Sequence, residues 1–239
     1  GLYLSSRDSN PEHLELRQAF LLTNSAWISI SLFGSLPFLF SNLNLNFIDA
    51  FFESTSGITT TGSTIIANLE QVSYGILLWR ALLQWLGGIG IIVMAVAILP
   101  MLSIGGMQLF KTESYETPDK IIPRAAIFAS GISIVYIVLT STWAFMLWLA
   151  GMPIFDSITH AMTTLATGGY STKSESLGAF NSVNIEMIIV FGMIVGSLPF
   201  IHYLSILKNG WKNLINDQQV KWFLFCLLYT SDAADERLS

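Results

Sequence analysis

The stretch FIDAFFESTSGITTTGST, residues 47–64, decides the fold, because it recurs as IFDSITHAMTTLATGGYS at residues 154–171. The two copies align without a gap at an offset of 107 residues, which places Gly62 over Gly169. Each copy begins with an apolar run of helical length, residues 47–58 and 154–166, that passes into a turn rich in threonine and glycine. Each is also too short to cross about 30 Å of hydrocarbon, which takes about 20 helical residues.

Longer apolar segments flank both copies. We predict four membrane-spanning helices, at about residues 18–40, 74–102, 125–150 and 183–207. Each short copy lies between two of them, so a unit of span, half-helix, polar turn and span occurs twice in the same direction. Non-helical backbone at membrane depth is tolerated only where protein or a water-filled path surrounds it. The sequence therefore predicts an all-α integral membrane fold with two parallel membrane–pore-loop–membrane repeats and re-entrant half-helices.

The composition agrees with a protein surrounded by membrane lipid. Hydrophobic residues make up 52% of the chain and charged residues 11%, with a mean hydropathy of +0.59, whereas soluble domains carry about 25% charged residues. The net charge is −5 and the 11 lysines and arginines are spread along the chain, which excludes a basic nucleic-acid-binding surface. The single cysteine, Cys226, excludes an intrachain disulfide or a thiolate metal cluster.

Lysine and arginine gather before the first predicted span, between the second and third, and after the fourth. Because positive residues mark the cytoplasmic side, both half-helices are expected to enter from the outside. The chain is expected to begin with the tail of an upstream segment at 1–16, followed by a first repeat at 17–104 and a cytoplasmic linker at 105–124. A second repeat is expected at 125–207, then a cytoplasmic segment with the start of a third repeat at 208–225, and a non-native tail at 226–239.

The tail is expected to be non-native because CLLYTSDAADE, residues 226–236, resembles the translation of a sequencing adapter. Its composition also changes abruptly from apolar to polar. A genuine polar tail is the alternative interpretation, and recovery of the same tail in the full-length gene would support it.

The two turns have a chemistry that suits a dehydrated cation. Asp49 and Asp156 are expected to cap the outer ends of the half-helices by accepting from free N–H groups. The opposite helix ends carry partial negative charge, which favours a cation, and glycine lets successive carbonyls point at one axis, as in potassium filters. The predicted cation-binding turns are Thr59-Thr60-Thr61-Gly62 and Ala166-Thr167-Gly168-Gly169. The alternative is that both are glycine helix caps with Ser/Thr hydroxyls bonded back to the helix.

Four ionisable side chains near the turns allow more than one role. Glu53 either tunes the field at the pore mouth or hydrogen-bonds the loop behind the turn. Arg80 either pairs with an acid or extends to the outer interface. Asp156 and His160 lie four residues apart on one helix face and suit an acid–base or metal pair, but no third ligand lies nearby in sequence. Because a third ligand is missing, a packing or capping role is favoured for Asp156 and His160.

Several runs together resemble the TrkH family within the Trk/Ktr/HKT superfamily. The runs are DAFFES (49–54), SGITTTG (56–62), LLQWLGGIGIIV (82–93), AILP (97–100), GGMQL (105–109), AGM (150–152) and GGYST (168–172). The resemblance covers about residues 10–225. It implies potassium uptake across the bacterial cytoplasmic (inner) membrane, with potassium ion as the substrate and without a bound cofactor.

In that family, four repeats in one chain surround a single pore, and each contributes a quarter of the filter. The resemblance implies filter carbonyls at Thr60, Thr61, Gly62, Thr167, Gly168 and Gly169, supported by Thr59, Ala166, Asp49, Asp156 and Glu53. It also implies a homodimer of the full-length protein and a cytosolic ring of nucleotide-binding regulatory subunits.

Only two repeats are recognisable in the sequence, so we predict that this polypeptide does not conduct alone. Within transport, the alternative function is sodium- or proton-coupled cation transport. Outside transport, it is an intramembrane enzyme that uses Asp156 and His160.

Overall fold

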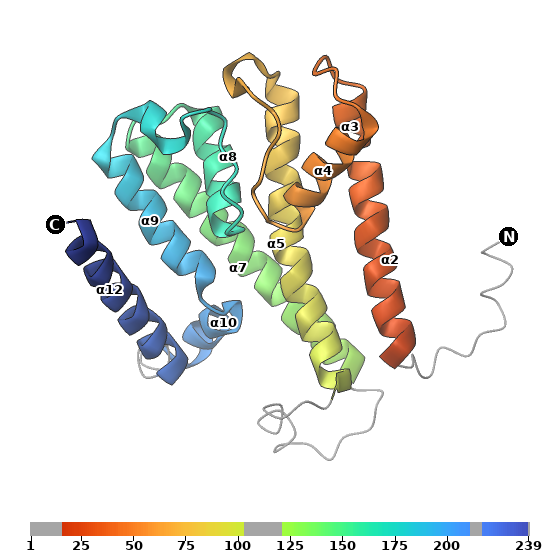
Figure 1. Ribbon diagram of the computed structural model, residues 1–239. Helices are drawn as coiled ribbons and strands as arrows, with labels where there is room; N and C mark the ends of the chain where they lie inside the picture. The colour runs from red at the N-terminus through yellow and green to blue at the C-terminus, as the bar shows by residue number, and fades with distance from the viewer. Residues whose placement is uncertain (1–15, 103–120, 211–216, 239) are drawn as a thin grey trace, which may run out of the picture.

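The structure is a computed structural model that describes residues 16–102, 121–210 and 217–238. In these ranges every regular element is a helix, and Figure 1 shows the long helices alongside one another, with the short helices α4 and α8 among them. α4 comprises Phe47–Ile58 and α8 comprises Ile154–Leu165, close to the bounds predicted for the half-helices. The predicted all-α fold class is confirmed.

The first unit runs from α2 to α5. Its elements are α2 (Leu16–Gly34), α3 (Leu36–Leu39), α4, the 3-10 helix η1 (Leu69–Gln71) and α5 (Tyr74–Leu102). α5 has the bounds predicted for the second span. The first predicted span, 18–40, is wrong as a single helix, because the chain is interrupted at Ser35 between α2 and α3. Pro37 explains the interruption, since proline lacks an N–H and its ring conflicts with the carbonyl four residues earlier.

The second unit runs from α7 to α10. Its elements are α7 (Ile121–Leu149), α8, the 3-10 helix η3 (Ser176–Phe180), α9 (Val183–Ser197) and α10 (Phe200–Asn209). The fourth predicted span, 183–207, is also wrong as a single helix. Leu198 is extended, with φ −77° and ψ 144°, and Pro199 then directly precedes α10. A residue before proline is driven out of the helical conformation, which explains the break.

The last helix, α12 (Gln218–Leu238), carries the predicted start of a third repeat and most of the predicted tail. The helix is continuous across Phe225, so the predicted boundary is not a structural break, and the origin of the tail stays a prediction. Most of the predicted cytoplasmic linker, 105–124, lies outside the described residues, as does nearly all of the predicted upstream tail, 1–16.

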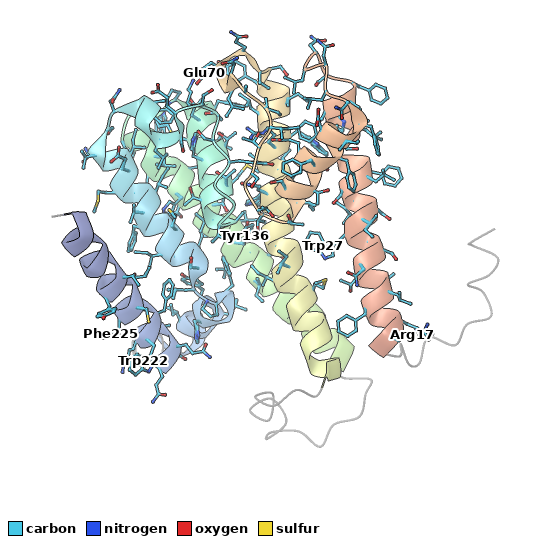
Figure 2. All side chains as sticks on the ribbon, in the orientation of Figure 1. Arg17, Trp27, Glu70, Tyr136, Trp222 and Phe225 are labelled. Carbon is cyan, nitrogen blue, oxygen red and sulfur yellow. The ribbon has the colours of Figure 1, made fainter. Side chains whose placement is uncertain are left out.

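Within the described residues, two helical stretches are long and apolar enough to cross a membrane, Tyr74–Ile92 and Ala129–Leu149. α9 is a shorter apolar helix. The helices of the other two predicted spans do not meet both conditions. Figure 2 shows Glu70 at one end of the helices and Arg17 and Trp222 toward the other, so the predicted outer and cytoplasmic sides lie at opposite ends.

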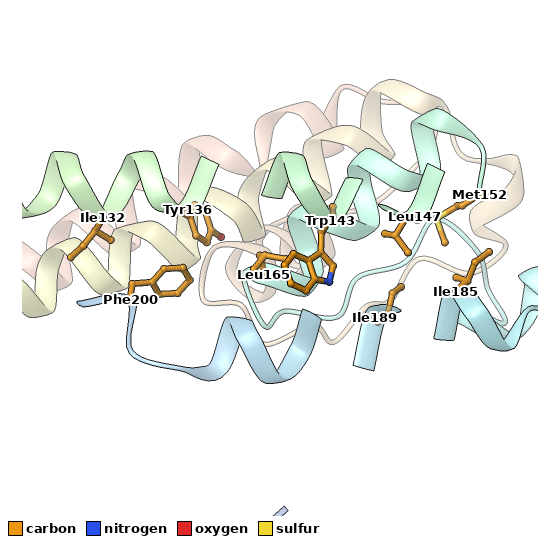
Figure 3. Packing of buried hydrophobic residues seen from close by; sticks show 10 residues of the cluster. Ile132, Tyr136, Trp143, Leu147, Met152, Leu165, Ile185, Ile189 and Phe200 are labelled. Atoms are coloured by element: carbon orange, nitrogen blue, oxygen red, sulfur yellow. The ribbon is translucent and has the colours of Figure 1, made fainter. Parts of the chain in front are cut away.

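Each unit has its own buried hydrophobic cluster. Figure 3 shows the cluster of the second unit, where Leu165 of α8 lies near Trp143 of α7 and Ile189 of α9. A side chain at Gly192 would collide with Trp143, and one at Gly196 would press on the Leu165 carbonyl. Glycine at these two positions thus permits close helix packing, which fixes α8 between α7 and α9.

The two units meet where α5 packs against α7 and α8. Trp85 of α5 stacks on Tyr136 of α7 with ring centroids 5.4 Å apart, and the Tyr136 hydroxyl donates to the Trp85 carbonyl at 3.1 Å. This contact brings the turn that follows α4 next to the turn that follows α8.

Candidate ion-binding site

The chain turns sharply where α4 ends, in residues 59–64, here called the first turn. Thr60 has a φ of 57° and Gly62 a φ of 81°, so two left-handed residues flank Thr61. The Thr61 N–H donates to the Ser56 carbonyl at 2.9 Å, and the Ser56 hydroxyl donates to the Ser63 carbonyl at 2.7 Å. The helix therefore ends in a Schellman-type cap, and the residues beyond it are tied back to its last turn.

The same geometry recurs where α8 ends, in residues 166–171, here called the second turn. Thr167 has a φ of 55° and Gly169 a φ of 77°. The Gly168 N–H donates to the Thr163 carbonyl at 2.9 Å, and the Thr163 hydroxyl donates to the Tyr170 carbonyl at 2.9 Å. These bonds correspond one to one with those of the first turn, so the predicted register of the two copies is confirmed.

The first N–H groups of each turn donate to carbonyls of the half-helices. Most carbonyls of the turns, in contrast, accept no hydrogen bond from the described residues, including those of Thr60, Thr61, Gly62, Thr167 and Gly169. Carbonyl oxygens of this kind replace water around potassium in channel filters. The two interpretations of the turns are thus compatible, because each turn is a helix cap that also leaves carbonyls unpaired.

Thr60 and Thr167 are β-branched residues in the left-handed region. Such a residue is a conformational outlier that costs about 1–3 kcal/mol. The strain persists only where the surroundings fix the backbone, and it gathers at functional sites. Matched strain at two equivalent positions marks both turns as candidate sites.

Glu53 lies behind the first turn and is completely buried. Its carboxylate accepts from the Thr64 hydroxyl at 2.9 Å and from the Ile65 N–H at 3.1 Å, and it pairs with the Arg80 Nε at 2.8 Å. Of the two roles predicted for Glu53, the structure shows hydrogen bonding behind the turn. Of the two predicted for Arg80, it shows pairing with an acid.

His160 occupies the place of Glu53 in the second unit. Its Nε2 lies 3.0 Å from the Ser171 hydroxyl, and its Nδ1 lies 2.8 Å from the Asp156 carbonyl. The Asp156 carboxylate accepts from the Thr172 hydroxyl at 2.6 Å. The side chains of Asp156 and His160 are therefore not bonded to each other, and each of them ties α8 to the chain that leaves the second turn.

Side chains of the first unit also hold the second turn. The Gln84 amide donates through Nε2 to the Gly168 carbonyl at 3.0 Å, and its Oε1 accepts from the Tyr170 N–H at 3.1 Å. One helical turn away on α5, Arg80 Nη1 donates to the Ser171 carbonyl at 3.1 Å. Two polar side chains on one face of α5 thus bind the backbone of the neighbouring unit.

Tyr170 makes the return contact from the second unit to the first. Its hydroxyl lies 3.1 Å from the carbonyls of both Glu53 and Ser63, and its ring lies under the Arg80 guanidinium, 4.1 Å from the centroid. Sequence reasoning missed both Gln84 and Tyr170. The signal for Gln84 was available, since it is a polar residue in an apolar span, four positions after Arg80 on the same helix face.

Comparison with known proteins identifies the family. The TrkH family model, described as a cation transport protein, matches residues 1–230. The chain belongs to the TrkH family. The Trk system potassium uptake protein TrkI of Halomonas elongata is 44% identical over 221 residues, which cover 91% of this chain and 44% of TrkI. The TrkH of Salmonella typhimurium is 42% identical over 215 residues, which cover 88% of this chain and 44% of that protein.

A solved structure agrees with this TrkH-family assignment. The crystal structure of the potassium transporter TrkH from Vibrio parahaemolyticus matches with a TM-score of 0.80 at 37% identity. The match covers 94% of this chain and 47% of that chain. This TrkH-family chain therefore spans about half the length of the relatives that it matches.

In this TrkH-family chain the two predicted helix caps are wrong. Asn46 caps α4, because its side chain accepts from the Asp49 N–H at 2.9 Å, and Pro153 precedes α8 without a side-chain cap. Asp49 and Asp156 lie three residues further on, in the first turn of each half-helix. A carboxylate at that place still interacts favourably with the positive end of the helix dipole.

The loops that follow the two turns are joined at the end of the molecule where Glu70 lies (Figure 2). The Glu70 carboxylate accepts from the Ser174 N–H at 2.8 Å and from the Ser174 hydroxyl at 2.7 Å, and the Leu69 N–H donates to the Ser174 hydroxyl at 3.0 Å. The Ser174 N–H, and next its hydroxyl, lower the pKa of Glu70 to about 2. The units are thus held together both behind the turns and at this surface.

A cavity of about 280 Å³ borders the second turn on the side away from the first unit. Residues that line it include Thr163, Thr167, Gly168, Gly169, Ile189 and Met193. A side chain built at Gly169 would meet nothing within 4 Å, whereas one built at the equivalent Gly62 would collide with the Gly168 carbonyl. The second turn thus lies beside Gly62 of the first turn, whereas no other turn lies beside Gly169 among the described residues.

Proposed function

We propose that this TrkH-family chain forms two of the four sides of a potassium path in the bacterial cytoplasmic membrane, and that its full-length form takes up potassium. The observation that carries the proposal is the pair of turns in register, each with a strained threonine and with carbonyls that accept no hydrogen bond from the described residues. The carbonyls of Thr60, Thr61, Gly62, Thr167 and Gly169 replace the water around a dehydrated ion, and the Gly168 carbonyl borders the same path.

The relatives support potassium as the cargo, because TrkI of Halomonas elongata and TrkH of Salmonella typhimurium are both named potassium uptake proteins. Coordination by backbone carbonyls requires no cofactor, so potassium enters only as the substrate. Sodium- or proton-coupled cation transport uses the same kind of path and stays as the alternative. An enzyme based on Asp156 and His160 lacks comparable support, since hydroxyls of other residues engage both side chains.

We propose further that the 239-residue chain does not conduct by itself. The open side of the second turn supports this, since two turns cannot enclose an ion on all sides. In its full-length form the protein is proposed to be a homodimer and to bind a cytosolic ring of nucleotide-binding regulatory subunits. The support for these partners is the family resemblance.

A glycine substitution tests the proposed path. The chain is joined to the remaining half of the Vibrio parahaemolyticus TrkH and expressed in a bacterium that lacks potassium uptake. Gly62→Ala is expected to lower potassium uptake by about tenfold or more, because its methyl group meets the Gly168 carbonyl and its φ of 81° is strained for alanine.

Gly178→Ala is the matched control, since a side chain there meets nothing within 4 Å. It is expected to leave uptake unchanged. Equal uptake by the Gly62→Ala and Gly178→Ala proteins, at equal amounts in the membrane, would contradict the proposed path. Potassium-selective flux through vesicles that contain only the 239-residue chain would contradict the second proposal.

A further inference from the structure

Gln84 is a completely buried polar side chain, and both the N–H and the oxygen of its amide are hydrogen-bonded to the backbone of the second turn. Its Nε2 donates to the Gly168 carbonyl and its Oε1 accepts from the Tyr170 N–H, at 3.0 Å and 3.1 Å. A buried amide with two such bonds has a fixed position, because breaking either bond would leave a polar group unpaired. Gln84 therefore fixes the backbone on both sides of Gly169.

The amide of Gln84 also explains why the second turn differs in sequence from the first. A side chain at Gly168 would collide with the amide group of Gln84. The equivalent position in the first turn carries Thr61, which is exposed and whose carbonyl accepts no hydrogen bond from the described residues. Gly168 and Gln84 thus form a matched pair, in which the missing side chain of one makes room for the other.

The carbonyls of the two turns are consequently not equivalent. In the first turn the carbonyls from Thr60 to Gly62 accept no hydrogen bond from the described residues, whereas the middle carbonyl of the second turn already accepts from Gln84. Selectivity among alkali cations depends on the number, position and field strength of the coordinating carbonyls. A carbonyl that is held by an amide donor has a fixed position and a weaker field for an ion.

We propose that Gln84 is a positioning residue that sets the preference of the path for potassium over sodium, by fixing the Gly168 carbonyl and the Tyr170 amide. The inference rests on the proposed function and adds a residue outside the turns themselves. Gln84 acts through the backbone of the neighbouring unit, so the effect of replacing it is on selectivity more than on the rate of transport.

The first test measures selectivity in the full-length form described above. Gln84→Met keeps the length of the side chain and removes both hydrogen bonds, and it is expected to lower the ratio of potassium to sodium uptake by about tenfold. Thr140→Val is the matched control, because Thr140 is also buried and its hydroxyl is hydrogen-bonded to Trp85 and to the Tyr136 carbonyl, outside both turns. Its ratio is expected to stay within about twofold of the unsubstituted protein.

A ratio in Gln84→Met that equals that of Thr140→Val would overturn the inference. Failure of the unsubstituted protein to prefer potassium would instead overturn the proposed function. In that case hydrogen exchange at the Tyr170 amide, measured on the 239-residue chain in detergent, decides whether Gln84 fixes the turn. Exchange is expected to be faster by about tenfold in Gln84→Met, and an unchanged rate would contradict the role of Gln84.

A second pair of variants covers the case in which Gln84→Met does not fold. Gly168→Ala is expected to reduce the amount of folded protein, because its methyl group meets the Gln84 amide. Adding Gln84→Ala removes that amide and is expected to restore folded protein without restoring the preference for potassium. A double variant that folds no better than Gly168→Ala, or one that regains full selectivity, would overturn the inference.

Discussion

Arg80 and Glu53 form an ion pair in which the guanidinium Nε lies 2.8 Å from the carboxylate Oε1 and both side chains are at most 1% exposed. The pair joins α5 to the back of the first turn, and the same guanidinium donates to the Ser171 carbonyl of the second unit. One buried cation therefore connects the half-helix of its own unit to the turn of the next.

Removing either partner of this pair is expected to be strongly destabilising, since it leaves the other charge buried and unpaired. Arg80→Gln and Glu53→Gln are each expected to lower the free energy of unfolding by about 3–5 kcal/mol. The double variant is expected to lose less than the sum of the two, because no lone charge remains. The measurement is thermal unfolding of the chain in detergent.

Arg17→Gln is the control for this prediction, because Arg17 is an exposed arginine of α2. The free energy of unfolding of Arg17→Gln is expected to stay within about 0.5 kcal/mol of that of the unsubstituted chain. Additive losses in the double variant, or single losses no larger than that of Arg17→Gln, would show that the pair does not stabilise the fold.

The contact between Glu70 and Ser174 predicts a dependence on pH in the acid range. The pKa of Glu70 falls from its ordinary 4.5 to about 2, so the contact stabilises the folded chain above pH 4.5 and is lost as the pH falls through about 2. Ser174→Ala is expected to raise the pKa of Glu70 only part of the way back. The Ser174 N–H, which lowers the pKa most, is still present in that variant.

A carbon-13 NMR titration of the Glu70 carboxylate measures this shift. Ser182→Ala is the control, since Ser182 precedes α9 without a side-chain cap bond and is not among the groups that shift the pKa of Glu70. A pKa of Glu70 that does not move in Ser174→Ala would contradict the geometry of the contact.

The left-handed threonines predict a gain in stability on substitution by glycine. Thr167→Gly relieves a strain of about 1–3 kcal/mol at the price of about 0.5–1 kcal/mol of chain entropy, so the free energy of unfolding is expected to rise by about 1 kcal/mol. Thr142→Gly gives the opposite sign, a loss of about 0.5–1 kcal/mol, because Thr142 is exposed within α7. Thermal unfolding of both variants checks the prediction, and a loss of stability in Thr167→Gly would show that Thr167 is not strained.

The features that could be predicted from the sequence are those that repeat or that depend on local chemistry. The offset between the two copies placed Gly62 and Gly169 at equivalent positions, and both have a left-handed conformation that glycine adopts readily. The half-helices were predictable from length alone, since an apolar run of 12 residues cannot cross a membrane. The breaks at Ser35 and Leu198 were harder to predict, because apolar residues continue on both sides of the prolines at positions 37 and 199.

The contacts between the units were less predictable, because they depend on which side chains the packing brings together. The donors to the second turn, Arg80 and Gln84, lie more than 80 residues away from it in sequence. The choice between the two roles of Glu53 likewise depended on the position of Arg80. The helix caps were assigned to Asp49 and Asp156 on residue type, whereas the residues at the N-cap positions lie three residues earlier.

Tyr170 gives a final test of how the two units depend on each other. Tyr170→Phe keeps the ring under the Arg80 guanidinium and removes the hydroxyl that binds the Glu53 and Ser63 carbonyls, so a loss of about 1 kcal/mol is expected. Tyr74→Phe is the matched control, because Tyr74 is 72% exposed and is expected to change the free energy of unfolding by less than about 0.5 kcal/mol. Adding Arg80→Gln to Tyr170→Phe is expected to give a non-additive loss, since both side chains hold the same turn. Equal unfolding midpoints for Tyr170→Phe and Tyr74→Phe would mean that the return contact from Tyr170 does not stabilise the fold.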